Sequence, residues 1–243
     1  MRVIPLRGIP ELDEGDDLAA LLASAAEGAG RLEPGDVLVV AQKAVSKVEG
    51  RVVRLSDVEA SARARELAGD EDPRRLEVIL RESRKVLRVR PPLVIAETHH
   101  GFVCASAGVD ASNAKGHGTV VLLPLDPDAS AQRLRDRIRE LAGIDVGVIV
   151  SDSFGRAWRR GTTDVALGVS GLTPLLDLEG QRDSAGYELH ATEIAVADEI
   201  AGAAELVMGK THGIPAAIVR GVEVAGDGRG ADLLMPRERD LFR

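Results

Sequence analysis

Residues 146–161 read VGVIVSDSFGRAWRRG and change abruptly from an apolar run to a polar and charged one. The apolar run 146–150 predicts a buried strand. Open α/β sheets bind ligands at the carboxyl ends of their strands. Asp152 and Ser153, which follow this strand, are therefore candidate ligand-binding residues.

The chemistry of this stretch favours a site for a metal ion and a phosphate. Carboxylate and hydroxyl oxygens are the ligands that Mg²⁺ and Mn²⁺ prefer. Guanidinium groups bind phosphate or carboxylate oxygens bidentately, and three of them follow closely, on Arg156, Arg159 and Arg160. A structural alternative stays open, in which Asp152 caps a helix and the arginines are solvated.

Outward from this stretch, apolar runs alternate with helical patterns. We expect helices over 57–69, with Asp57 as N-cap, over 73–89, beginning at Pro73, over 130–142, and over 191–208. Leu134, Ile138 and Leu141 are expected on the inner face of the third helix, and Ile194, Ala197 and Ala201 on that of the fourth. Strands are expected at 36–41, 93–97, 102–107, 119–123, 146–150, 163–170 and 215–219, with a β-hairpin around 98–101. This order predicts an α+β, or mixed α/β, fold with partly antiparallel sheets and flanking helices.

Three further segments carry candidate ligands. Asp110 and Asn113 offer oxygen atoms three positions apart after a predicted turn at Gly108, where an ordinary Asp/Asn/Ser turn is the alternative. Lys43 and Lys47 share a face at the exit of the strand 36–41 and suit phosphate, unless they form a solvated basic loop.

The third segment is the glycine-containing turn within 206–215. It is not a phosphate-binding P-loop, because the first glycine of that motif is absent, with Ala at 204 and Glu at 205, and the predicted order is helix, turn, strand. It either contacts a nucleotide through backbone N–H groups or caps the preceding helix at Gly209.

Length, composition and net charge argue against several classes of protein. The length of 243 residues suits one or two domains. The net charge of −8 argues against nucleic-acid or membrane-surface partners, and five aromatic residues argue against a base-stacking platform. Cys104 is the single cysteine, and residues 1–8 lack an apolar signal-peptide core, so we expect a cytoplasmic protein.

With these segments in place, the chain resembles the coenzyme F420-0:L-glutamate ligases, the gamma-glutamyl ligases of deazaflavin cofactor biosynthesis. The resemblance covers nearly the whole chain and is closest to the bacterial-type ligase domain, without its fused flavin-binding reductase domain. The motifs that carry it are GIP (8–10), EGDDL (14–18), VSKVEG (45–50), GVDASN (108–113), PLDPD (124–128), SDSFGRAWRRG (151–161), VADEIA (196–201) and GIP (213–215).

The resemblance implies a GTP-dependent, GDP-forming acid–amino-acid ligase. Its substrates would be L-glutamate and a deazaflavin precursor, and its ions Mg²⁺ or Mn²⁺, with K⁺ as a further candidate. It also implies one ligase domain over 1–243, in two closely associated lobes with the second inserted around 65–145, and an intertwined homodimer. A separate flavin-dependent reductase is a candidate partner.

By the same resemblance, Asp110, Asp152 and Ser153 are expected to bind metal, and Asp110, Asp152, Arg156 and Arg159 are the expected catalytic residues. The expected nucleotide contacts are Ile9, Pro10, Glu11, Leu12, Gln42, Lys43, Lys47, Asn113, Met208, Gly209, Lys210, Thr211, His212, Gly213 and Ile214.

Lys210 departs from the family pattern, because archaeal members place a glutamate ligand there. A protonated lysine cannot bind a metal ion, so either a second metal is absent or Lys210 supplies part of its charge. Two alternative functions stay open. One is a ligase of the same fold for a related deazaflavin intermediate or another carboxylate, and the other is a non-catalytic nucleotide-binding subunit of a reductase.

Overall fold

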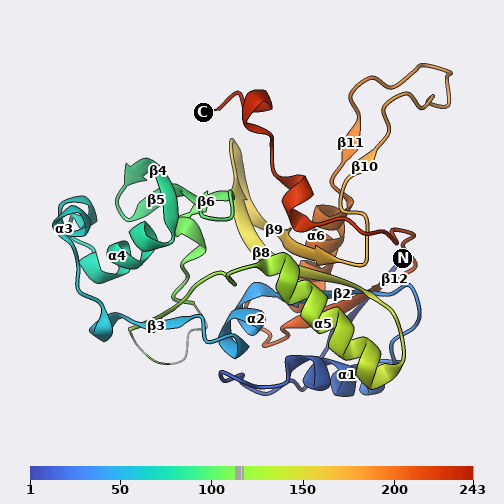
Figure 1. The fold of residues 1–243 in the computed structure, drawn as a ribbon, viewed down its shortest axis with the longest axis horizontal. Coiled ribbons are helices and arrows are strands. Elements are labelled where there is room, and N and C mark those ends of the chain that lie inside the picture. The colour runs from blue at the N-terminus through green and yellow to red at the C-terminus, as the bar shows by residue number, and fades with distance from the viewer. Residues whose placement is uncertain (113–115, 117, 243) are drawn as a thin grey trace.

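The computed structural model describes residues 1–112, 116 and 118–242 (Figure 1). Its central sheet has the strand order β1-β12-β2-β8-β9, in which β2 and β8 run parallel and the other neighbours run antiparallel. The bounds are β1 (Arg2–Leu6), β2 (Val37–Ala41), β8 (Gly147–Arg156), β9 (Arg159–Ser170) and β12 (Ala216–Arg220). The prediction of a mixed, partly antiparallel sheet is confirmed.

Helices cover both faces of this sheet, which explains why its inner strands are apolar throughout. On one face lie α1 (Leu18–Gly28) and α5 (Pro127–Ala142), and on the other lies α6 (Val196–Met208) (Figure 1). Alternate residues of β2 serve the two layers: Leu38 and Val40 pack in the first, Val37 and Val39 in the second. The sheet therefore forms the middle of a three-layer core.

A second hydrophobic core gathers buried residues between Leu55 and Leu122. Two helices and two small antiparallel sheets, β3-β7 and β4-β5-β6, build it. Their bounds are β3 (Val52–Arg54), α3 (Ala62–Ala68), α4 (Pro73–Arg81), β4 (Ser83–Arg90), β5 (Leu93–Thr98), β6 (Val103–Ala105) and β7 (Thr119–Val121).

The remaining elements are short. The helix α2 (Gln42–Val48) follows β2 directly, and β10 (Leu176–Asp177) pairs with β11 (Glu193–Ile194) at the base of a projecting arm (Figure 1). Short 3₁₀ helices lie at Leu55–Asp57, Ser106–Gly108, Gly230–Leu233 and Arg237–Arg239. Within the described residues, no helix combines the length and the apolar character needed to span a bilayer.

Several predicted boundaries are wrong for physical reasons. The helix expected over 73–89 ends at Arg81, because the residues that follow pair antiparallel with β5 as the strand β4. The helix expected from Asp57 begins at Ala62, where Ser61 accepts a hydrogen bond from the Ala64 N–H as N-cap.

The fourth helix and the strand at 146–150 also differ from expectation. α6 begins at Val196, so Ile194 lies in β11 instead of on the helix, whereas Ala197 and Ala201 are buried as predicted. On α5, Leu134 and Ile138 are buried but Leu141 is 43% exposed. The strand that begins near residue 146 does not end at Asp152 but continues to Arg156, because β9 pairs with it along its whole length.

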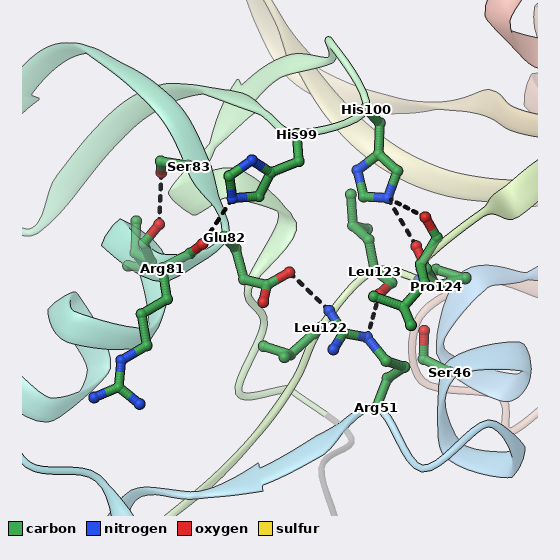
Figure 2. A network of polar contacts seen from close by, with 12 residues as sticks. Ser46, Arg51, Arg81, Glu82, Ser83, His99, His100, Leu122, Leu123 and Pro124 are labelled. Carbon is green, nitrogen blue, oxygen red and sulfur yellow. Dashed lines mark hydrogen bonds and ion pairs between the residues drawn. The ribbon is translucent and has the colours of Figure 1, made fainter.

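Polar contacts join the two cores (Figure 2). Arg51 donates from Nε to the Leu123 carbonyl at 2.9 Å and from Nη2 to Glu82 Oε2 at 2.7 Å. His100, at the tip of the β5–β6 hairpin, donates from Nε2 to the Pro124 carbonyl at 2.9 Å. These bonds hold the α4–β4 connection against the chain that enters α5.

Candidate active site

A cavity of about 410 Å³ lies where β2 and β8 run toward the same edge of the central sheet. Their parallel register sets Ala41 opposite Ser151. Two pairs of residues follow these positions in the chain and line one cavity. They are Gln42 and Lys43, after Ala41, and Asp152 and Ser153, after Ser151.

Most of the predicted site residues line this cavity. They come from four segments far apart in the sequence: the turn after β1, the start of α2, the strand β8, and the turn between α6 and β12. The lining residues that were predicted are Ile9, Pro10, Glu11, Leu12, Gln42, Lys43, Lys47, Asp152, Ser153, Met208, Gly209, Lys210, Thr211, Gly213 and Ile214.

Three lysines give the cavity positive charge. Lys43 Nζ lies 2.6 Å from Asp110 Oδ2 and 2.6 Å from Ser112 Oγ, and Lys47 pairs with Glu11. Lys210 is exposed on the α6–β12 turn and forms no ion pair with any other described residue. Lys210 is thus the lysine of this cavity that is available without breaking an existing pair.

Gln42 is almost fully buried, with 2% of its surface exposed. Its amide nitrogen donates to Ser46 Oγ at 2.6 Å and to the Leu122 carbonyl at 2.7 Å. Both side-chain donors are therefore used within the protein. Gln42 offers a ligand its backbone and its amide oxygen.

Asp110 is held at the entrance to the second core by a turn. Its Oδ1 accepts from the Ser112 N–H at 2.7 Å, and its Oδ2 accepts from Ser112 Oγ at 2.9 Å, so the Asp/Ser turn considered as an alternative does form. Burial raises the pKa of Asp110, but the Lys43 ammonium and the Ser112 donors outweigh it and leave the pKa below its usual value. Asp110 is therefore a carboxylate at neutral pH.

In Asp152 the causes that raise the pKa outweigh those that lower it. Burial is the main cause that raises the pKa of its carboxyl from 3.8 to about 6, and the carboxylates of Asp164 and Asp110 add to the rise. The Ser153 N–H and Lys43 lower it only in part. A buried carboxylate beside two others is costly unless a cation approaches it.

Asp164 and Glu205 line the cavity and were missed by the sequence analysis. Asp164, in β9, stands opposite Ser153 and accepts from Ser153 Oγ at 2.6 Å and from Ser151 Oγ at 2.9 Å. Glu205, in α6, accepts from the Asp164 N–H at 3.1 Å. Asp164 reaches the cavity because 159–170 pair antiparallel with 147–156, and no local signal in the sequence marks it.

The donor set fits a hard cation whose coordination a ligand would complete. Within the described part of the chain, no three His, Cys, Asp or Glu side chains are arranged to hold a metal ion alone. Asp110 and Asp152 supply two carboxylates, and Ser153 keeps its oxygen lone pairs because it donates its proton to Asp164. Mg²⁺ commonly binds one or two carboxylates and takes its other oxygens from phosphate and water.

Five predicted residues are not among those that line the cavity. Asp110 is one of them, and it contacts the cavity lining through its ion pair with Lys43. Arg156 and Arg159 are exposed at the far end of the β8–β9 hairpin, as is Arg160. His212 lies on the α6–β12 turn, with its ring against Gly209. Asn113 lies outside the described residues.

The turn at 209–215 lies between a helix, α6, and a strand, β12, which is the order that argued against a P-loop. Gly209 caps α6 with a φ of +56°, and its N–H donates to the Glu205 carbonyl at 2.9 Å. The helix-cap alternative is therefore confirmed, and the same turn also lines the cavity.

One family model and several known proteins are similar to this chain. A family model described as F420-0:Gamma-glutamyl ligase matches residues 8–221. A coenzyme F420:L-glutamate ligase of Methanothermobacter thermautotrophicus is 44% identical, with 99% of this chain and 98% of that protein covered. Proteins of the same name from Methanopyrus kandleri and Archaeoglobus fulgidus are 46% and 44% identical, with 98% and 96% of their lengths covered.

The fold and these comparisons thus define an α/β enzyme of the ligase class. The chain belongs to the F420-0:gamma-glutamyl ligase family. These three relatives are archaeal, so the closer resemblance to the bacterial-type domain stays a prediction.

Proposed function

We propose that this protein is a GTP-dependent, GDP-forming ligase that joins L-glutamate to the deazaflavin precursor coenzyme F420-0 through a gamma-glutamyl amide bond. One observation carries the proposal beyond family membership. A single cavity gathers the carboxylates of Asp152 and Asp164, three lysines and the α6–β12 turn. That combination suits a nucleotide triphosphate together with a cation.

The nucleotide would lie along the lysines. Lys43 and Lys47 line the cavity from α2, and Lys210 lines it from the α6–β12 turn. Their ammonium groups neutralise phosphate oxygens, and the glycines at 209 and 213 let backbone N–H groups approach a ligand closely. We assign this wall to the GTP phosphates.

Asp110, Asp152 and Ser153 would hold Mg²⁺ or Mn²⁺. Such a cation, when bound, withdraws electron density from phosphoryl oxygens and neutralises charge. Asp164 accepts the Ser153 proton and so turns the lone pairs of Ser153 toward the ligand side. Lys210 offers part of the positive charge that a second cation would bring.

The reaction would pass through an acyl phosphate. A carboxylate is a poor electrophile, so its oxygen first attacks the γ-phosphorus of GTP and GDP leaves. The glutamate ammonium loses a proton to water, and the resulting amine attacks the acyl carbon. The C–N bond forms, the C–O bond to phosphate breaks, inorganic phosphate leaves, and the nitrogen releases its second proton. Both steps gather negative charge, which the lysines stabilise, and they need positioning more than a protein nucleophile.

An intertwined homodimer in the cytoplasm is the assembly that we propose. Trp158, at the end of the β8–β9 hairpin, is 83% exposed, and its ring lies 5.1 Å from that of Phe242, which is 77% exposed. Exposed aromatic rings on a projecting hairpin suit an interface between protomers. Sedimentation analysis of the wild type and Trp158→Ser tests this, with a monomeric wild type as the contrary result.

The activity test supplies purified protein with GTP, Mn²⁺, L-glutamate and coenzyme F420-0. We expect GDP release and products heavier by one or more glutamyl units in mass spectrometry, and a parallel reaction with ATP tests the nucleotide. No GDP release with the correct precursor would overturn the proposal. GDP release only with another deazaflavin carboxylate would favour the alternative substrate.

A further inference from the structure

Two carboxylates of α6 accept hydrogen bonds from backbone N–H groups of β9. Glu205 Oε2 accepts from the Asp164 N–H at 3.1 Å, and Asp198 Oδ1 accepts from the Ala166 N–H at 2.8 Å. Within the described residues β9 is the last strand of the central sheet, so these N–H groups point away from its neighbour β8. Both side chains therefore satisfy strand-edge donors.

Close packing brings Glu205 to this position. Gly202 faces β9, and a Cβ built there would lie 3.2 Å from Thr163 Oγ1. The absence of a side chain at 202 lets α6 approach β9 closely, one helical turn before Glu205.

The two carboxylates differ in what else they face. Glu205 lines the candidate active-site cavity, whereas Asp198 does not. Glu205 Oε1 has no hydrogen-bond or ion-pair partner among the described residues. Glu205 thus lines the cavity and keeps one carboxylate oxygen that its strand-edge role does not use.

The other carboxylates at the cavity are already engaged. Glu11 pairs with Lys47, and both oxygens of Asp164 accept serine hydroxyls. Asp152, with Asp110, is the candidate cation ligand. Glu205 is therefore the carboxylate best able to accept a new N–H donor from a bound molecule.

We propose that Glu205 binds the ammonium group of the amino-acid substrate, an inference that rests on the proposed ligase function. An ammonium group brings one positive charge and three donors. A carboxylate with one oxygen anchored and the other free accepts such a donor in a charge-assisted hydrogen bond. The three lysines of the cavity would bind the phosphates and repel an ammonium.

The test compares Glu205→Gln with the matched control Asp198→Asn. Each substitution keeps an oxygen that can accept the strand-edge N–H, and each removes one negative charge. We expect Glu205→Gln to raise KM for L-glutamate by about 10- to 100-fold, the range for losing a charge-assisted hydrogen bond. KM for GTP and the Kd for Mn²⁺ should stay within about 2-fold, and Asp198→Asn should leave all three constants near wild-type values.

A substrate analogue sharpens the readout. Glutarate is glutamate without its amino group, so wild-type protein should bind glutamate more tightly than glutarate in competition experiments. Glu205→Gln should lose most of that preference, and Glu205→Asp should recover part of it. A purely structural role for Glu205 would not alter this ratio.

An unchanged glutamate/glutarate preference in Glu205→Gln would overturn the inference. A comparable loss of the glutamate/glutarate preference in Asp198→Asn would also overturn it, because Glu205 would then act only at the strand edge. A weakened Mn²⁺ affinity in Glu205→Gln would overturn it too, because Glu205 would then act on the cation. If Glu205→Gln does not fold, Glu205→Asp and the wild-type preference decide the question. A wild-type protein that forms no glutamylated product would instead contradict the proposed function.

Discussion

At the scale of single residues, Asp152 shows a conflict between stability and function. Its carboxyl is partly buried beside two other carboxylates, and its pKa is raised to about 6. Folding without a cation therefore costs free energy at neutral pH. Such a cost is expected at a binding site, where the ligand relieves it.

Asp152→Asn should stabilise the protein measured in EDTA while it abolishes turnover. The folded pKa of about 6 lies above the ordinary 3.8, so the unfolded state ionises first and stability falls as pH rises from about 4 to 6. Asparagine avoids this penalty, and we expect a gain on the order of 1–3 kcal/mol at neutral pH, which vanishes below about pH 4. Turnover should fall by at least about 100-fold.

Thermal unfolding across pH measures the stability, and GDP release measures turnover. The control is Asp145→Asn, whose carboxylate is 54% exposed and pairs with Arg135. This variant should change stability by less than about 1 kcal/mol. A less stable Asp152→Asn at neutral pH in EDTA would contradict the account of the site.

At the scale of elements, short turns deliver the site residues. Gly108 has a φ of +74°, and a Cβ at that position would lie 2.6 Å from Leu123 Cγ. No other residue fits this backbone and this contact together. The turn leads directly to Asp110, so its geometry places one of the candidate metal ligands.

Gly108→Ala should destabilise the protein by about 2 kcal/mol or more, because it combines an unfavourable φ with a steric clash. Mn²⁺ binding should weaken as well. Gly143→Ala separates the two causes, because Gly143 has a φ of +68° with no atom within 4 Å of its Cβ position. Calorimetry of both variants checks this, and equal losses of stability would show that the Leu123 contact is unimportant.

Glu77 connects α4 to the start of α3. It accepts from the Ser61 N–H at 3.0 Å and from Arg81 Nε at 2.9 Å. The hydrogen bonds from Ser61 are the main reason that the pKa of Glu77 lies near 2 instead of 4.5. The depressed pKa means that its stabilisation is complete above about pH 4.5 and is lost as pH falls toward 2.

Glu77→Gln should therefore lower stability by about 1–2 kcal/mol at neutral pH. Its difference from wild type should shrink steadily between pH 4.5 and 2. Denaturant unfolding at several pH values measures this trend, and a difference that grows on acidification would contradict the assignment. Glu66→Gln, an exposed change on α3, is the control.

At the scale of the whole molecule, the joint between the two cores decides whether Asp110 faces Asp152. Arg51 and Glu82 are both about four-fifths buried, with 19% and 20% of their side chains exposed. Arg51 also bonds to the Leu123 carbonyl (Figure 2). Removing either partner leaves the other, largely buried charge without its ion-pair partner.

Arg51→Ala should cost about 2–3 kcal/mol and Glu82→Ala about 1–2 kcal/mol. The double variant should lose about 1 kcal/mol less than the sum, because the two residues share one interaction. Denaturant unfolding of all four proteins closes this cycle, with Arg137→Ala as an exposed ion-pair control. Fully additive losses would show that the pair does not couple the two cores.

Local chemistry was sufficient for much of this protein. The apolar runs at 36–41 and 146–150 predicted buried strands, and Pro73 marked a helix start. Asp152, Ser153, Lys43 and the turn at 208–214 were candidate ligand-binding segments, and they line one cavity. These signals depend on residues near one another in the chain. They are therefore visible in the order of the amino acids.

Tertiary pairing decided the rest. Residues 83–90 become a strand because β5 lies beside them, and β8 continues past Asp152 because β9 pairs with it, which carries Arg156 and Arg159 away from the cavity. Asp164 and Glu205 look like ordinary surface carboxylates in sequence. Only packing of α6 and β9 around the end of β8 places them in the cavity, because burial and electrostatic coupling depend on neighbours that are distant in the chain.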